Sequence, residues 1–338
     1  MSAVVVFMLW TVAPRFSVAG GVENDSTKKL NQKIYFTPAD DHFISSEINK
    51  KIDKVDGMKI LEFVKTLTAD SFEGRASGTI GYNKAGQWLA GQFKRVGIKP
   101  FLKHSYFQPF KIAHQYIRQR IYADVKGDSA ETFNVIGWIE GQELKNEFVV
   151  MTAHLDHLGM KLSMTGDKDT IFYGANDNAS GVSVMLSVGE TLVEMKPKRS
   201  ILFVAFSGEE VGLLGSKYFV EHSPVPLEQI RFLLNLDLVG SGHDGIMVQG
   251  VNDFPQEFST VSGINRSYFG FELSTRPNSP NSDQYYFNAL GVPAFFMYAY
   301  KGTNPYHLPG DVWQGLDMMV LENVAKFSAM VVWKFAQF

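Results

Sequence analysis

Hydrophobic and polar positions follow two different periods along most of the chain. Apolar residues recur every three to four positions over 55–70 and 81–100, which predicts two helices. Continuous apolar runs of strand length follow, and they alternate with further helical patterns. We predict strands over 118–125, 132–141, 147–155, 199–206, 230–239 and 292–300, and helices over 181–195, 213–222, 253–265, 282–291 and 316–338. This alternation predicts a three-layer α/β domain with a largely parallel central sheet.

The first 54 residues follow a different pattern. A short apolar run, "AVVVFMLWTVA", precedes the small residues "SVAG", which is typical of a signal peptide cleaved after residue 19. Neither Lys nor Arg precedes this run, so a buried first strand or a membrane anchor remains an alternative. Residues 20–54 are polar without clear periodicity and are expected to form an N-terminal extension. We therefore expect a secreted or periplasmic protein with one domain over 55–338.

Composition narrows the function only slightly. The chain has 338 residues, is 45% hydrophobic and carries a net charge of −3, so its charge gives no reason to expect nucleic acid or an anionic membrane as partner. It has no cysteine, which excludes disulfides and thiolate chemistry but does not identify the compartment.

Ionisable residues stand repeatedly where a predicted strand ends or just beyond it. In an open α/β sheet the carboxyl ends of parallel strands form one edge, and ligands bind there. The segments concerned are "AHLDHLG" with His154 and Asp156, "GANDNASG" with Asp177, "SGEEVGLLGS" with Glu209 and Glu210, "NLDLVG" with Asp237 and "YHLPGD" with His307. We expect these five segments to converge on one site.

The residue types favour a metal site. Histidine and carboxylate ligands suit zinc, which they bind at about 2.0–2.2 Å. Two zinc ions about 3.5–4 Å apart require one bridging carboxylate and two further ligands each. His154, Asp177, Glu210, Asp237 and His307 match that number. Glu209 can then serve as general base for a water, and Asp156 can accept the second ring N–H of His154.

Each residue alone has an ordinary explanation. A histidine at a strand end is most often a surface residue, and Asp177 before "NASG" could cap a helix. The remaining histidines, including His157, are expected to be ordinary ones. The case for a metal centre depends on the five segments together.

Taken in order, the five segments closely resemble the di-zinc aminopeptidases of the bacterial leucyl aminopeptidase and aminopeptidase Y type. The resemblance covers residues 55–338 and includes the upstream segment "SFEGRASGTIGYNKAGQWLAGQFKRVGIKP". It implies a three-layer α/β/α sandwich with a central mixed, mostly parallel sheet. It also implies hydrolysis of N-terminal residues from peptides that have a free N-terminus. By position, His154, Asp237 and the bridging Asp177 would hold one zinc, Asp177, Glu210 and His307 the other, with Glu209 as general acid/base and Asp156 as orienting carboxylate.

Two departures from the family are visible. Many relatives carry a protease-associated insert, for which residues 110–148 are too few, so we expect none. Relatives often have His where Gln284 stands, which leaves the ligand set intact but could alter the substrate pocket. Candidates for an apolar pocket wall are Tyr285, Tyr286, Phe287, Phe296, Met297, Tyr298 and Tyr306.

Three other functions stay open on the same fold. A glutaminyl cyclase would work with one zinc. A carboxypeptidase would need a cation to hold the substrate carboxylate, with Arg75, Arg266 and Arg276 as candidates. A receptor ectodomain without activity would normally have lost ligands. We expect peptide substrates, no nucleic acid and no stable membrane association after signal cleavage; the oligomeric state is open.

Overall fold

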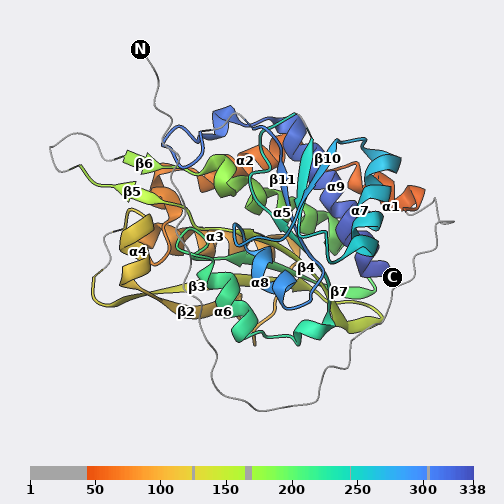
Figure 1. Cartoon of the computed structure of the whole chain (residues 1–338), viewed down its shortest axis with the longest axis horizontal. Helices are drawn as coiled ribbons and strands as arrows, with labels where there is room; N and C mark the ends of the chain where they lie inside the picture. The colour runs from red at the N-terminus through yellow and green to blue at the C-terminus, as the bar shows by residue number, and fades with distance from the viewer. Residues whose placement is uncertain (1–43, 124–125, 164–169, 244, 303–304) are drawn as a thin grey trace. The chain divides into compact units, whose positions relative to one another are not determined.

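A computed structural model describes residues 44–123, 126–163, 170–243, 245–302 and 305–338 (Figure 1). The predicted signal peptide and most of the predicted extension lie outside these residues. No helix among the described residues combines the length and the apolar character needed to cross a membrane.

The fold is a mixed sheet covered by helices. The strands are β1 (Lys99–Pro100), β2 (Phe107–Ala113), β3 (Ser129–Ile139), β4 (Leu144–His154), β7 (Arg199–Phe206), β8 (Ile230–Leu236), β9 (Ile246–Gln249), β10 (Leu273–Arg276) and β11 (Ala294–Ala299), with β5 (Gly159–Lys161) and β6 (Thr170–Phe172) as a separate pair. The main sheet has the order β1-β3-β7-β4-β8-β11-β9-β10, and β2 also pairs with β3. Strands β7, β4, β8 and β11 run parallel at the centre, whereas β3 and β9 join them antiparallel.

The helices divide between the two faces of this sheet. They are α1 (Ser46–Ile52), α2 (Gly57–Leu67), α3 (Ile80–Val96), α4 (His114–Arg120), α5 (Ser180–Val193), α6 (Leu214–Glu221), α7 (Pro255–Tyr268), α8 (Gln284–Ala289) and α9 (Met318–Gln337). Helices α2, α3, α5, α7 and α9 contribute to the larger core on one face, and α6 and α8 cover the other (Figure 1). The three-layer α/β/α sandwich with a mixed, mostly parallel centre is therefore confirmed.

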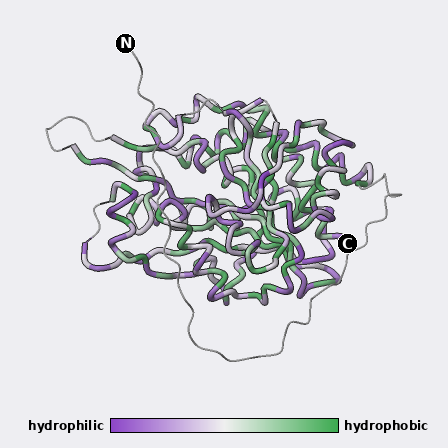
Figure 2. Tube along the Cα trace, in the orientation of Figure 1, coloured by the Kyte–Doolittle hydropathy of each residue, from purple (hydrophilic) through white to green (hydrophobic). Residues whose placement is uncertain are grey.

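Successive side chains of the central strands point alternately into the two hydrophobic cores, one on each face of the sheet. On β4, Val149 and Met151 are fully buried in the larger core. Val150 points the other way, into the cluster that contains Phe219 of α6 and Phe287 of α8. Figure 2 shows the hydrophobic character of these central strands. Because successive strand residues face opposite sides, a strand with helices on both faces must be apolar throughout.

The structure differs from the sequence prediction in several places, among them the unpredicted strands β2, β9 and β10. The predicted strand over 118–125 is wrong in its first part, because the chain is helical in α4, where His114 and Ile117 share the buried face. Part of the predicted loose extension forms α1, which packs against α9. Ile44, Ile48 and Ile52 contact the larger core, and their spacing of four is helical.

Candidate metal centre

The side chains singled out by sequence meet at the carboxyl edge of the parallel strands. His154 is the last residue of β4, and Asp237 follows the end of the neighbouring strand β8. Glu209 and Glu210 lie in the turn after β7. His307 lies in the loop after β11, and Asp177 lies in the irregular turn Ala175–Ala179 before α5. All five predicted ligands come together here.

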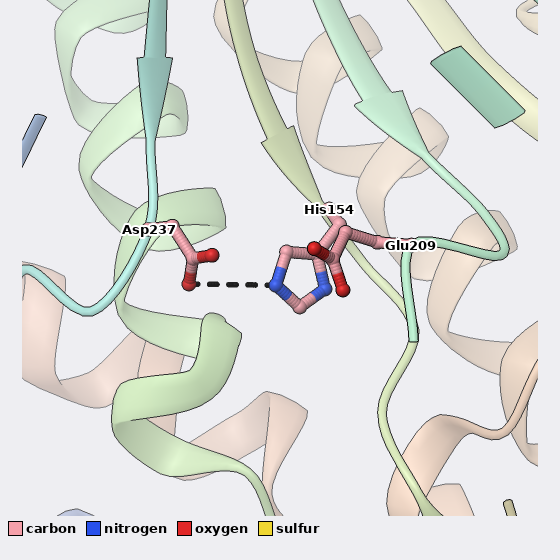
Figure 3. Close-up of side chains that lie close together, drawn as sticks. All are labelled: His154, Glu209 and Asp237. Carbon is pink, nitrogen blue, oxygen red and sulfur yellow. Dashed lines mark ion pairs between the residues drawn. The ribbon is translucent and has the colours of Figure 1, made fainter. Parts of the chain in front are cut away.

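One half of the centre is almost closed to solvent. His154 is 1% exposed, and its Nε2 lies 3.2 Å from Asp177 Oδ1 and 3.4 Å from Asp237 Oδ1. The carboxylate of Glu209 approaches the same ring from the side of β7 (Figure 3). We call His154, Asp237 and the Oδ1 atom of Asp177 the inner half.

The other half opens toward a loop. His307 Nε2 lies 3.1 Å from Asp177 Oδ2 and 3.1 Å from Glu210 Oε2, and the His307 side chain is 35% exposed. We call His307, Glu210 and the Oδ2 atom of Asp177 the loop half. Asp177 thus presents one carboxylate oxygen to each half, as a bridging ligand requires.

The spacing of these atoms fits zinc ligands. Two ligands about 2.0–2.2 Å from a tetrahedral zinc are themselves about 3.3–3.6 Å apart. The nitrogen–oxygen distances in both halves, from 3.1 to 3.4 Å, lie near that value. Within the described residues, the Nε2 atoms of His154 and His307 make no hydrogen bond, although carboxylate oxygens surround them. The residues present therefore fit a pair of metal ions.

Asp156 occupies a different position from the one expected. The Nδ1 atom of His154 is 3.0 Å from the main-chain carbonyl oxygen of Asp156 and 3.8 Å from its carboxylate. The Asp156 carboxylate instead accepts the main-chain N–H of Glu209, at 3.3 Å. The difference arises because β4 ends at His154, so strand alternation no longer holds two residues later. Asp156 therefore connects the segment carrying His154 with the turn carrying Glu209.

His157 is a member of the site that the sequence analysis left out. It is fully buried, and its Nδ1 lies 2.7 Å from Glu210 Oε1. Glu210 therefore divides its two oxygens between His157 and His307. The sequence feature that could have indicated His157 is the spacing "HLDH", in which a second histidine stands three residues after the predicted ligand His154.

Charges crowd this site. Burial lowers the pKa of His154, but Asp237 and Glu209 outweigh it and raise that pKa well above its usual value. Burial likewise lowers the pKa of His307, but Asp177 and Glu210 raise it to about 10. Burial, together with the charge of Glu210, raises the pKa of Glu209 well above its usual range. These carboxylates attract positive charge, which protons or metal ions can supply.

Arg75 has a different role from the one a carboxypeptidase would need. Its guanidinium is fully buried and donates to main-chain carbonyl oxygens, including those of Leu155 and Gly174. It is therefore not presented to a substrate carboxylate. The other two candidate arginines, Arg266 and Arg276, are exposed on α7 and β10.

The predicted pocket wall divides between core and surface. Phe287, Phe296 and Met297 are buried. Tyr306 is 60% exposed, and its ring stacks on that of His307 with centroids 3.8 Å apart. Gln284 is buried and donates to Asn278. Tyr306 thus has the most direct contact with the metal centre among these candidates.

Comparison with known proteins agrees with this arrangement. The chain is 31% identical to aminopeptidase YwaD of Bacillus subtilis over 188 residues, which are 53% of this chain and 39% of that protein. In structure it is similar to an aminopeptidase from Aneurinibacillus sp. strain AM-1, with a TM-score of 0.69 and 17% identity, covering 86% of this chain and 96% of that one. A glutaminyl cyclase of Bacteroides thetaiotaomicron is also similar, with a TM-score of 0.64 and 20% identity, covering 82% and 98%.

These similarities differ in what they establish. The structural similarities are below 25% identity and show the fold alone. The chain spans 39% and 44% of the length of the first two curated relatives that it matches. The sequence profile of peptidase family M28 matches residues 134–332, more than half of the chain and all of the predicted metal ligands. The chain belongs to peptidase family M28.

Proposed function

We propose that the chain is a zinc aminopeptidase that removes residues from the free N-terminus of peptides. His154, Asp177 and Asp237 would hold one zinc, and Asp177, Glu210 and His307 the other. The observation that carries the proposal is the position of Asp177, whose Oδ1 lies 3.2 Å from Nε2 of His154 and whose Oδ2 lies 3.1 Å from Nε2 of His307. Relatives named aminopeptidase and probable zinc metalloprotease support it.

The chemistry follows from the roles of the side chains. When bound, zinc would polarise the peptide carbonyl and increase the acidity of the attacking water. Glu209 accepts a proton from that water while the water oxygen forms a bond to the carbonyl carbon. As the C–N bond breaks, Glu209 returns the proton to the leaving amine. Without metal, burial and the neighbouring Glu210 raise the pKa of Glu209, whereas the positive charge of bound zinc would favour its carboxylate form, which accepts the proton.

The free N-terminus is the sharpest test of the proposal. We expect a zinc-loaded protein to release single residues from a leucine peptide and to leave the acetylated form of the same peptide intact. The two peptides differ only in the amine, so each is the control for the other. Equal cleavage of both peptides would contradict the aminopeptidase assignment.

The glutaminyl cyclase alternative needs its own substrate, because such an enzyme shares this fold. A peptide that begins with glutamine distinguishes the two reactions. An aminopeptidase releases free glutamine, whereas a cyclase converts the N-terminal residue to pyroglutamate and releases ammonia. Mass spectrometry separates these products, and pyroglutamate as the main product would replace our proposal with the cyclase.

We also propose that the protein is exported to the periplasm or the medium. The proposal rests on the apolar run and the small residues that precede residue 20. N-terminal sequencing of the native protein is expected to find a start near Gly20 or Gly21. An intact Met1 on a cytoplasmic pool would contradict it.

A further inference from the structure

The segment that carries Asp177 is held by two buried side chains of opposite charge. On one side, the Arg75 guanidinium donates to the carbonyl oxygens of Tyr173 at 2.8 Å and Gly174 at 2.9 Å. The same guanidinium donates to Leu67, at the end of α2, at 2.8 Å and to Leu155 at 3.0 Å. Leu155 directly follows His154, so Arg75 joins the segments that carry two ligands of the inner half.

Asp311 holds the same segment through its main-chain N–H groups. Its carboxylate accepts from Asn176, at 2.9 and 3.1 Å, and from Asp177 itself, at 3.0 Å. The N–H of Ala175 donates to the Asp311 carbonyl oxygen at 3.2 Å. Asp311 stands four residues after His307 and is 1% exposed. It therefore joins the bridging ligand to the loop that carries His307.

We propose that Arg75 and Asp311 are positioning residues that set the bridging carboxylate of Asp177 between His154 and His307 before any metal binds. The inference rests on the metal centre of the proposed function. The contacts that carry this inference all reach main-chain atoms of the ligand segments and leave the metal-ligating atoms themselves untouched.

Charge and burial explain why these contacts are strong. Hydrogen bonds from an ionised group are about twice as strong as neutral ones. Burial lowers the pKa of Arg75 to about 10, which still leaves the guanidinium charged at neutral pH. The planar guanidinium of arginine carries several N–H donors that point in different directions, so it can bind several carbonyl groups at once. The compact ammonium group of lysine cannot match this geometry. Losing either charge would leave buried main-chain groups without partners.

The approach of Arg75 to the site requires unusual backbone. Glu73, Gly74 and Arg75 all have positive φ values, of 51°, 67° and 51°. A Cβ at Gly74 would collide with the carbonyl oxygens of Gly159 and Phe172, so glycine is required there. Strained backbone of this kind persists only where surrounding contacts over-determine it, and it clusters at functional sites.

The decisive experiment is titration of the metal-free protein with zinc alone, followed by calorimetry. Loss of groups that orient metal ligands typically weakens metal affinity by about 10–100-fold. We expect losses in that range for Arg75→Lys and Asp311→Asn, neither of which alters a ligand.

The chain offers a matched control for each variant. Arg199 is another buried arginine that donates to a carbonyl oxygen, that of Phe335, but it stands at the opposite end of β7 from the metal centre. Asp317 is another carboxylate that accepts two main-chain N–H groups, at the start of α9. Arg199→Lys and Asp317→Asn should lower the melting temperature without changing zinc affinity. If the site variants lose no more affinity than their controls, the proposal is wrong.

The wild-type protein allows a test that does not depend on a variant folding. Amide hydrogen exchange in residues 173–177 should be as slow in the metal-free protein as in the zinc-loaded one. Rapid exchange that zinc alone suppresses would contradict the idea that the segment is positioned in advance. A wild-type protein that binds no zinc would contradict the proposed function instead.

Discussion

The two halves of the metal centre are built in different ways. The inner half stands on adjacent parallel strands, β4 and β8, and its residues His154 and Asp237 are 1% and 6% exposed. The loop half has no strand residue, and His307 lies in a loop with a positive φ of 55°. Glu210 in this half depends on His157 for its orientation. Sheet hydrogen bonds thus position His154 and Asp237, whereas His307 and Glu210 depend on loop and side-chain contacts, and Asp177 is shared by both halves.

For the two-zinc centre that we propose, this difference implies unequal binding of the two ions. Ligands at the ends of paired strands lose little freedom when a metal binds, whereas the 35% exposed side chain of His307 loses more rotamer freedom. The loop half is also more open to water. We therefore expect the inner half to hold its zinc more tightly.

The largest effect should come from Glu209, which lies close enough to His154 and Asp237 to form a possible metal-binding group with them, and to which the proposed function assigns the role of base. Glu209→Gln keeps the shape of the side chain and removes the base. The catalytic rate should fall by about 10²–10⁴, the usual contribution of a positioned general base. Zinc content and substrate affinity should both survive.

The neighbouring Glu210 provides the contrast. Glu210→Gln removes an anionic ligand from the loop half, so one zinc per chain should be lost while the inner half keeps its own. The melting temperature should fall, because a ligand present at 100 times its Kd stabilises the native state by about 2.7 kcal/mol. Zinc stoichiometry measured beside the catalytic rate separates the two variants.

Opposite results would change the assignments. Metal loss in Glu209→Gln with full metal content in Glu210→Gln would exchange their roles. Full activity in both variants would contradict the mechanism.

The same contrast between halves explains what the sequence could predict. His154 and Asp237 stand at the carboxyl ends of apolar strands, and parallel strands bring these ends to one edge of the sheet. The sequence pattern alone was therefore enough to predict that the two residues lie close together. His157 has no such pattern, because its place depends on a turn in which its N–H donates to the carbonyl oxygen of Arg75. Asp311 accepts hydrogen bonds from the main-chain N–H groups of Asn176 and Asp177, which lie 135 and 134 residues earlier in the sequence. No local sequence pattern predicts that these residues come into contact.

The fold shows the same limit. The buried central strands were predictable because their apolar runs are long. The short strands β9 and β10 were missed, because each has only four residues. Residues 118–120 were misassigned as strand, because the packing of His114 and Ile117 places them in the helix α4. Tertiary contacts therefore outweighed local pattern where that pattern was short.

The smallest expected effect concerns the electrostatic crowding of the inner half. Asp283 is fully buried, and burial together with Asp156 and Asp237 raises its pKa to about 7. An unfolded aspartate has a pKa of about 3.9. The folded state therefore binds a proton that the unfolded state has released between these values. Its contribution to stability is fully present below pH 4 and is lost as the pH rises toward 7.

Asp283→Asn should remove this pH dependence from the metal-free protein. We expect the variant to melt a few degrees above the wild type at pH 7.5 and to lose that advantage progressively toward pH 4. Thermal unfolding in a chelator across this range measures the difference. His307, in the loop half, provides the comparison, since its raised pKa of about 10 gives a contribution that is lost only as the pH rises from about 6.5 to 10. A constant difference between Asp283→Asn and wild type at all pH values would mean that Asp283 is ionised in the folded protein and that the inner half carries less electrostatic strain than its burial indicates.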